Sequence, residues 1–201
     1  MAEWRKIYDY WFGAPAADGH GEVREFWFAS TADTDRELQE RLQDMYHRAA
    51  EGGFQDWKSD ARSWVALIVV LDQVPRNIFR GNGQSFAADP VALATAKELV
   101  ASPLHAELST VEKLFAYLPF EHSENIADQL KSVALFEDID EHQNKAEWID
   151  FAILHKDIVE KFGRFPHRNA MLGRETTPEE EAWLQSSGQH FGTVPDDSDN
   201  A

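Results

Sequence analysis

Two stretches of this 201-residue chain contain neither Asp nor Glu, although the whole chain carries a formal charge of −17. We name them the first basic segment (residues 73–88) and the second basic segment (residues 161–174). Forked guanidinium donors on a rigid, Pro- and Gly-containing backbone are what a carboxylate- or phosphate-binding pocket requires. The side chains that could supply this chemistry are Arg76 and Arg80 in the first segment, and Arg164, His167, Arg168 and Arg174 in the second.

The first basic segment follows an acidic residue at helical spacing. Asp72, Arg76 and Arg80 lie at positions i, i+4 and i+8, so they share one face of a helix. In one interpretation this row, with Asn77 beside it, opens on a ligand pocket, and Asp72 orients Arg76. In the other, the guanidinium groups brace helices by bonding to carbonyl groups that the neighbouring Pro and Gly leave free. The sequence leaves both interpretations open.

The second basic segment is expected to be irregular, and it is long for a connection inside a helical domain. Arg164, His167 and Arg168, with Asn169 next to them, would suit a carboxylate or a phosphate. A loop of this length can instead pack on itself and serve as a lid. The sequence therefore predicts either a ligand-binding loop or a self-packed one.

Histidines add a third possibility, which is acid–base catalysis. His122 or His167 could transfer a proton beside negative charge that arginine stabilises, with Glu124 orienting a histidine. The two-residue spacing of His122 and Glu124 is not that of a zinc motif, so no metal site is predicted. His155 lies on an apolar helix face, where we expect a structural histidine with one bonded nitrogen.

Composition limits the class of protein. Hydrophobic residues make up 43% of the chain, with 7 Trp and 13 Phe, so we expect a packed globular core. Cys is absent, which excludes disulfides, thiolate ligands and Cys nucleophiles and suits the cytoplasm, where we expect the protein. The longest apolar run, residues 64–71, is far shorter than the roughly 20 residues that a membrane-spanning helix needs.

Charge and motifs limit the partners. The strong negative charge disfavours binding to nucleic acid and to anionic membranes. No phosphate-binding P-loop, nucleophile elbow or zinc-protease motif occurs, so no cofactor is predicted. The predicted partner is therefore a small anion or a peptide carboxylate, and the oligomeric state stays open.

The hydrophobic pattern is helical nearly throughout. The run over 60–79 has no polar side, so we expect it to be surrounded by other helices, with a break at Pro75. Capping boxes are predicted at Ser109/Glu112 and Thr177/Glu180, and Asp89 is predicted as an N-cap. The expected helices cover residues 3–12, 22–28, 34–51, 60–79, 91–101, 125–139 and 145–162, with further helices opening at 109 and 177.

These elements predict an all-α fold. We expect an antiparallel array of helix hairpins that is tetratricopeptide-like but has no regular sequence repeat. Residues 1–187 are expected to form a single domain. Residues 188–201 are acidic and contain Gly and Pro, so we expect a disordered tail.

Four motifs in fixed order resemble one known family. They are LDQVPRNIFRG (71–81), SFAADP (85–90), FAYLPFEHSE (115–124) and FGRFPHRNAMLGRETTPEE (162–180), with Gln129 between the last two. Together they resemble the bacterial domain-of-unknown-function family 924 over about residues 4–187, with Val74 and Thr176 where the family usually shows Phe and Ser. The resemblance implies an all-α, tetratricopeptide-like single-domain protein and no reaction. Its signature residues lie in the two basic segments and at the His122 turn, which favours a shared polar site.

Overall fold

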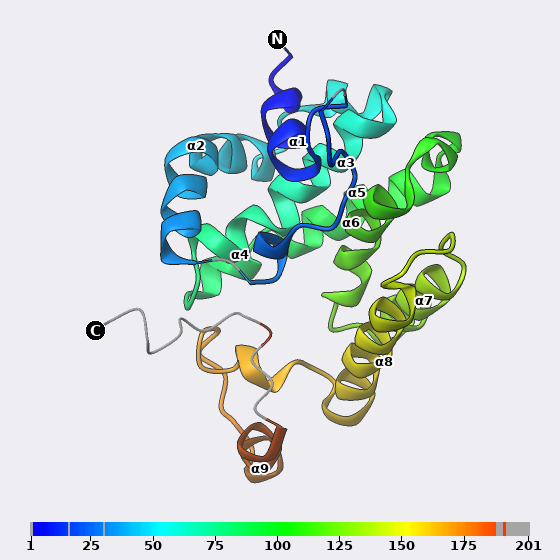
Figure 1. The fold of residues 1–201 in the computed structure, drawn as a ribbon. Helices are drawn as coiled ribbons and strands as arrows, with labels where there is room; N and C mark the ends of the chain where they lie inside the picture. Colours follow the sequence, from blue (N-terminus) through cyan, green and yellow to red (C-terminus); the bar gives the residue numbers. More distant parts are fainter. Residues whose placement is uncertain (1, 16, 30, 188–190, 192–201) are drawn as a thin grey trace.

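The regular elements of this protein are helices. The computed structural model describes residues 2–15, 17–29, 31–187 and 191, and no strand occurs among them, which confirms the all-α class. The α-helices are α1 (Trp4–Phe12), α2 (Ala32–Ala50), α3 (Ala61–Asp72), α4 (Val74–Ile78), α5 (Asp89–Ala101), α6 (Thr110–Glu121), α7 (Ile126–Glu137), α8 (Lys145–Phe162) and α9 (Pro178–Ser187) (Figure 1). Short 3-10 helices lie between them: η1 (Glu25–Trp27), η2 (Gln55–Ser59), η3 (Gly83–Phe86), η4 (Pro103–Glu107) and η5 (Pro166–Arg168).

Helix α3 lies at the centre of the main hydrophobic core. Every one of its residues except Arg62 is buried, because α1, α2, α5 and α6 pack around it (Figure 1). The expectation that this apolar run is surrounded by other helices is therefore confirmed. Within the described ranges, no helix is long and apolar enough to cross a membrane.

The helix predicted over 60–79 is two helices, α3 and α4, because Pro75 interrupts it. Proline has no N–H to continue the helical bonding. The N–H of Arg76 donates to the carbonyl of Gln73 (3.0 Å), and the carbonyl of Asp72 accepts from the guanidinium group of Arg76 instead. The break thus turns the Arg76 side chain back toward the end of α3.

Helix α6 also has a proline near its end. The predicted capping box of Ser109 and Glu112 starts the helix. Pro119 lies in its last turn, and the N–H of His122 still donates to the carbonyl of Leu118 (2.9 Å). The helix ends at Glu121, and His122 begins the short turn to α7.

Helices α5 to α8 pack in consecutive pairs. Helix α6 contacts α5 and α7, and α7 lies side by side with α8 (Figure 1). Helix α2 packs against α3 and α4. This pairing agrees with a helix-hairpin array, whereas the tetratricopeptide-like arrangement and the single domain over 1–187 stay predictions.

The second basic segment packs against the C-terminal part of α8. Phe165 is fully buried and forms a small hydrophobic cluster with Ile158 and Val159 of α8. Helix α9 follows and opens with the predicted capping box: the N–H of Thr177 donates to Glu180 (2.8 Å) and that of Glu180 to the Thr177 hydroxyl (3.2 Å). Apart from Phe191, the tail predicted over 188–201 lies outside the described residues.

Two local predictions are wrong. The helix expected over 22–28 is only the 3-10 turn η1, because its aromatic side chains pack against Trp11, Phe12 and Phe115 rather than along one helix face. Asp89 does not cap α5: it is the first residue of the helix, and its carboxylate binds arginine side chains instead. A nearby cation competes successfully with the backbone N–H groups for that carboxylate.

The central position of α3 leads to a stability prediction. Leu71→Ala should lower the free energy of unfolding by roughly 2–5 kcal/mol, because a buried side chain is lost and a cavity remains. Urea denaturation followed by circular dichroism measures this change. Leu130→Ala is the control, since Leu130 is exposed on α7 and should change stability little. Equal effects of the two substitutions would contradict the central placement of α3.

Candidate functional site

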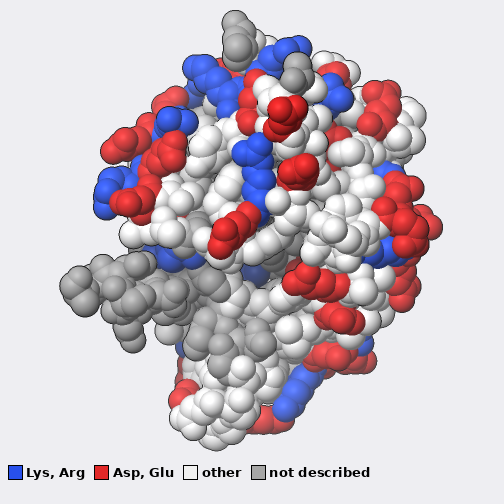
Figure 2. Space-filling model, viewed as in Figure 1, with Lys and Arg blue, Asp and Glu red and all other residues white. Residues whose placement is uncertain are grey.

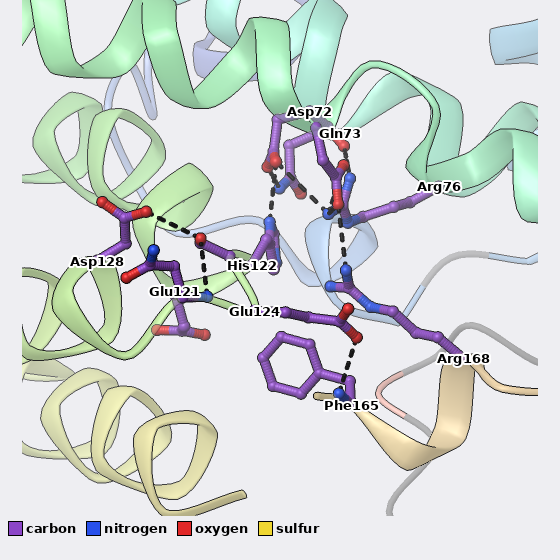
Figure 3. Close-up of polar contacts among 12 residues, drawn as sticks. Asp72, Gln73, Arg76, Glu121, His122, Glu124, Asp128, Phe165 and Arg168 are labelled. Atoms are coloured by element: carbon purple, nitrogen blue, oxygen red, sulfur yellow. Dashed lines mark hydrogen bonds and ion pairs between the residues drawn. The ribbon is translucent and has the colours of Figure 1, made fainter. Parts of the chain in front are cut away.

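The ends of α3 and α6 bring together an aspartate and a histidine. Asp72 is the last residue of α3, and His122 caps α6. The distance between His122 Nδ1 and Asp72 Oδ1 is 2.9 Å (Figure 3). A proline lies near the end of each helix, Pro75 after α3 and Pro119 in the last turn of α6. The two helix ends point their last polar side chains toward each other. We call this pair the His122–Asp72 dyad.

Asp72 is a fully buried carboxylate held by several donors. Gln73 Nε2 donates to its Oδ2 (2.6 Å), and Arg76 Nη2 lies 3.5 Å from its Oδ1. Burial alone would raise the pKa of Asp72, but the charge of Arg76, the imidazole of His122 and the hydrogen bonds from His122 and Gln73 hold that pKa well below its ordinary value. Asp72 is therefore ionised at neutral pH and is paired with Arg76.

His122 is the neutral partner of the dyad. Burial and the charge of Arg76 lower its pKa, and the carboxylate of Asp72 opposes them only in part. A neutral imidazole that donates from Nδ1 to a carboxylate carries its lone pair on Nε2. The His122 side chain is 14% exposed, so solvent or a ligand can reach the imidazole.

A buried glutamine fixes the turn that carries His122. Gln129, on α7, is fully buried, and its Nε2 donates to the carbonyls of Glu121 and Ser123, each at 2.6 Å. These carbonyls flank His122 and would otherwise lack helical partners. Gln129 thus ties α7 to the end of α6 and sets the position of the imidazole.

The two basic segments meet at Asp89, as expected from their shared lack of acids. Arg76 Nη2 lies 3.1 Å from Asp89 Oδ1, and Arg168 Nη1 lies 3.2 Å from Asp89 Oδ2 (Figure 3 shows both arginines). Both guanidinium groups also lie over the ring of Phe86, Arg168 at 4.5 Å and Arg76 at 5.9 Å from its centre. One carboxylate from α5 therefore joins the two segments.

The backbones of the two segments also approach closely. A Cβ atom added at Gly83 would lie 2.6 Å from the carbonyl oxygen of Met171, a separation that real side chains do not adopt. Gly83 is needed here for space, not for an unusual backbone angle. The absence of a side chain at this position lets the second segment lie directly against η3.

The other arginines take their counter-charges from distant elements. Carboxylates from α2, α9 and the turn after α6 supply the acids that the basic segments lack. On the visible face, Lys and Arg are interspersed with Asp and Glu rather than gathered in a basic patch (Figure 2). The closest N–O distances are 2.6 Å for Arg80–Asp35, 2.6 Å for Arg164–Glu180 and 2.8 Å for Arg174–Glu124. These arginines fit the bracing interpretation.

Glu124 does not orient a histidine, so that part of the catalytic hypothesis is wrong. Its carboxylate accepts from the N–H of Phe165 (2.8 Å) and from Arg174 (2.8 and 3.0 Å) (Figure 3). Burial would raise its pKa, but these donors hold it below the ordinary value. Glu124 instead fastens the turn after α6 to the second basic segment, and Asp72 takes the role of histidine partner.

A cavity of about 510 Å³ opens beside the dyad. Of the residues predicted to bind a ligand, Arg76, Asn77 and Arg80 line it, and so does His122, a candidate catalytic residue. The other predicted ligand-binding residues do not line it: Asp72, Arg164, His167, Arg168 and Asn169. Arg168 is paired with Asp89, and Asn169 Nδ2 donates to Glu180 (3.2 Å). The remaining lining residues are Val23, Arg24, Glu25, Trp27, Phe28, Gln73, Leu114, Leu118, Glu121, Phe136, Asn144, Glu147, Trp148, Phe151, His155 and Phe191.

Glu121 and His155 form a second polar pair on the cavity wall. Their Oε1 and Nδ1 atoms are 3.2 Å apart, and the carboxyl group of Glu121 points away from His122 toward α8 (Figure 3). Burial and the negative charge of Asp72 raise the pKa of Glu121 to about 8. Burial lowers the pKa of His155 to about 3, so near neutral pH this contact joins two largely uncharged groups. His155 Nδ1 also bonds to the carbonyl of Phe151 (2.8 Å), as expected for a structural histidine.

The sequence pattern does not reveal Glu121 as a site residue, because its acidic neighbours at positions 124 and 128 resemble a solvated turn. Glu121 is buried because other helices, α3 and α8 among them, pack against α6. The ring centres of Phe191 and His155 are 4.3 Å apart, which places an aromatic residue from near the chain end against this pair. Among the residues that the structure describes, no group of three or more His, Asp or Glu side chains is arranged to hold a metal ion.

Comparisons with known proteins agree with the fold. Residues 7–188 match the family described as "Bacterial protein of unknown function (DUF924)". The solved structure of a protein of unknown function from Agrobacterium tumefaciens is similar, with 37% sequence identity and a TM-score of 0.79, covering 91% of this chain and 97% of that one. The search of curated proteins gave no match.

The raised pKa of Glu121 leads to a prediction about pH. Between its ordinary pKa of 4.5 and the folded-state value of about 8, the unfolded protein releases a proton that the folded protein retains. This difference makes stability fall as pH rises through that window, by about 1.4 kcal/mol for each unit of pKa shift. Glu121→Gln removes the titration, so its stability relative to wild type should improve steadily from pH 5 to pH 8. Urea midpoints at several pH values measure the difference.

The comparison with wild type is essential, because His155 acts in the opposite direction. The pKa of His155 is lower in the folded protein than in the unfolded protein. Its contribution therefore makes stability rise as the pH rises toward 6.5. The control is Glu141→Gln, in which the lost carboxylate is 93% exposed. A stability difference between Glu121→Gln and wild type that does not change with pH would show that Glu121 ionises normally.

Proposed function

The chain belongs to the bacterial family of unknown function DUF924, and we propose that in this member the cavity is an active site in which His122 is the general base. The observation that carries the proposal is the His122–Asp72 contact of 2.9 Å on the wall of a 510 Å³ cavity. A carboxylate on Nδ1 leaves Nε2 as the basic atom of a neutral imidazole. A base of this kind transfers protons efficiently near neutral pH.

Asp72 gives His122 the two properties that a general base needs. Its carboxylate fixes the tautomer and the orientation of the ring, as in other histidine–carboxylate pairs. When Nε2 takes a proton, the buried negative charge stabilises the resulting imidazolium. Arg76 and Gln73 keep Asp72 ionised, so the aspartate does not compete with His122 for the proton.

The nucleophile in this scheme is not a side chain. Among the described residues that line the cavity there is no Ser or Thr, and the chain has no Cys. The proton that His122 removes therefore comes from water or from the bound substrate. Arg76 lines the same wall and would stabilise negative charge that develops on a substrate oxygen.

The charge balance of the site favours an uncharged substrate over an anion. Arg76 is already bonded to Asp72 and Asp89, and Arg80 to Asp35. An anion entering the cavity would meet the negative charge of these carboxylates, which already offsets that of the arginines. An uncharged group with an oxygen acceptor avoids this repulsion and can accept from a remaining guanidinium N–H.

The enzymatic proposal predicts that His122 is needed for turnover. Purified protein is incubated with a bacterial metabolite extract, and compounds consumed are identified by mass spectrometry. We expect wild type to consume at least one compound, and His122→Asn to consume it at least 100-fold more slowly because the base is lost. Asp72→Asn should also be slow, since the tautomer of His122 is no longer fixed.

The matched control is His47→Asn, which replaces an exposed histidine on α2 that does not line the cavity. It should behave as wild type. Circular dichroism and thermal unfolding establish that each variant is folded before its activity is measured. Consumption of the same compounds at unchanged rate by His122→Asn would exclude His122 as the base.

Anion binding without catalysis is the second candidate function. The observation that favours it is that Arg76, Asn77 and Arg80 all line the cavity. If it holds, phosphate should raise the melting temperature more than chloride does at equal ionic strength. A ligand at about 100 times its dissociation constant contributes roughly 2.7 kcal/mol to folding.

The test variant for anion binding is Arg76→Ala, which should abolish the extra stabilisation by phosphate. If Arg76 only braces the helices, the variant should instead lose stability in every buffer, because Asp72 and Asp89 lose their counter-charge. An identical phosphate increment in wild type and in Arg76→Ala would exclude an anion site at this residue.

A further inference from the structure

The cavity beside the dyad is apolar over most of its wall. Side chains from η1, α6, α7 and α8 supply this surface. The polar groups cluster at the dyad and the first basic segment, and Arg24, Glu25, Asn144 and Glu147 add polar groups elsewhere on the wall. Apolar walls with a few polar groups at one place bind a ligand whose body is apolar and whose reactive group is polar. The apolar lining residues with large side chains include Trp27, Leu114, Leu118, Phe136, Trp148 and Phe151.

The apolar surface continues into solvent. Phe28 and Phe151 line the cavity and are 57% and 45% exposed, and Val23 beside them is 36% exposed. Three of the seven large hydrophobic side chains exposed in the described part of the chain thus lie at this one cavity. Exposed apolar groups that gather at a cavity, instead of being scattered, indicate a binding surface.

The polar groups are compact enough to bind one functional group. His122 and His155 have ring centres 6.4 Å apart, and Glu121 bonds to His155. Gln73 and Arg76, which follow α3 in the sequence, line the same cavity. A single carbonyl group at this place could therefore meet both the basic nitrogen of His122 and the guanidinium group of Arg76.

The volume limits the length of the ligand. A cavity of 510 Å³ lies within the range of about 300–1,000 Å³ that is usual for pockets that bind small molecules. A ligand of roughly 10–15 non-hydrogen atoms fills such a space while leaving room for an attacking water molecule. A longer chain has to extend past Phe28 and Phe151 into solvent.

We infer that the substrate is an ester of a medium-chain carboxylic acid, with about eight to ten acyl carbons, and that it is hydrolysed at His122. This inference rests on the proposed acid–base function. The acyl chain lies against Trp27, Leu118 and Trp148, and the ester carbonyl lies beside His122 and Arg76.

The reaction balances with water as the only co-reactant. Nε2 of His122 takes a proton from water while the water oxygen bonds to the carbonyl carbon, and the carbonyl electron pair moves onto the oxygen beside Arg76. The tetrahedral intermediate then collapses, its C–O bond to the alcohol breaks, and His122 returns the proton to the departing alkoxide. The products are a carboxylic acid and an alcohol.

Hydrolysis of p-nitrophenyl esters with 2, 4, 8, 10 and 16 acyl carbons tests the inference. We expect kcat/KM to be highest for the esters of 8 and 10 carbons and at least tenfold lower for those of 2 and 16 carbons. Each buried methylene group should increase binding about fourfold until the cavity is filled. His122→Asn should lose the activity with every ester. Equal activity across the series would overturn the chain-length assignment.

A binding measurement separates this inference from the proposed function. The unreactive ketones 2-butanone, 2-decanone and 2-octadecanone are titrated calorimetrically into wild type and into His122→Asn. We expect 2-decanone to bind most tightly to both proteins, since the chain pocket does not need the base. Binding of 2-decanone without hydrolysis of any ester would overturn the ester assignment. If His122→Asn loses metabolite turnover but no ketone binds to wild type, the inference of an apolar substrate is overturned. The proposal that His122 is the general base then still stands.

Two exposed positions provide a matched pair of variants. Phe151→Asp places a charge at the cavity rim and should weaken binding of 2-decanone at least tenfold with little effect on 2-butanone. Leu130→Asp places the same charge on α7 at a residue that is 57% exposed and does not line the cavity, and it should leave binding unchanged. An equal effect of the two substitutions would show that the chain does not pass the rim at Phe151.

Discussion

The buried carboxylate of Asp72 is the charge around which the polar part of this protein is built. It lies at the C-terminal end of α3, where the helix dipole already places negative charge, and it is fully buried. A carboxylate in such a place is tolerated only when several donors surround it. Gln73, Arg76 and His122 provide them, and each comes from a place where a proline interrupts or ends a helix.

The partners of Asp72 link it to more distant parts of the chain. Arg76 has more donor capacity than one carboxylate uses, so it also binds Asp89 at the start of α5. Asp89 in turn holds Arg168 and with it the second basic segment. The same charge acts on Glu121, whose pKa it helps to raise, so one carboxyl group of the site is ionised and the other largely protonated near neutral pH. Two acidic groups with such different states are what an active site needs if it is to accept and to donate protons.

Local sequence patterns predicted the parts of the structure that depend on neighbours along the chain. The buried helix α3, the break at Pro75 and the capping boxes at Ser109 and Thr177 follow from periodicity and from backbone hydrogen bonding. The meeting of the two basic segments was also predictable, because arginines without local acids need distant ones. Which acids those are was not predictable. Asp89 resembles an N-cap and Glu124 a histidine partner, and only the packing of helices far apart in sequence assigns their arginines. The same holds for Glu121, whose neutral state depends on burial by α3 and α8.

The contact between Gly83 and the carbonyl of Met171 has a consequence for how this sequence can vary. Two peptide backbones touch there with nothing between them, so a single added methyl group must move one of them. The second basic segment would then shift away from η3 and carry Arg168 with it, leaving Asp89 with one arginine instead of two. A substitution remote from His122 would in this way alter the electrostatic potential at the imidazole without changing any group that touches it. The lack of space for a side chain at position 83 therefore affects the proton affinity of His122, although the two residues do not touch.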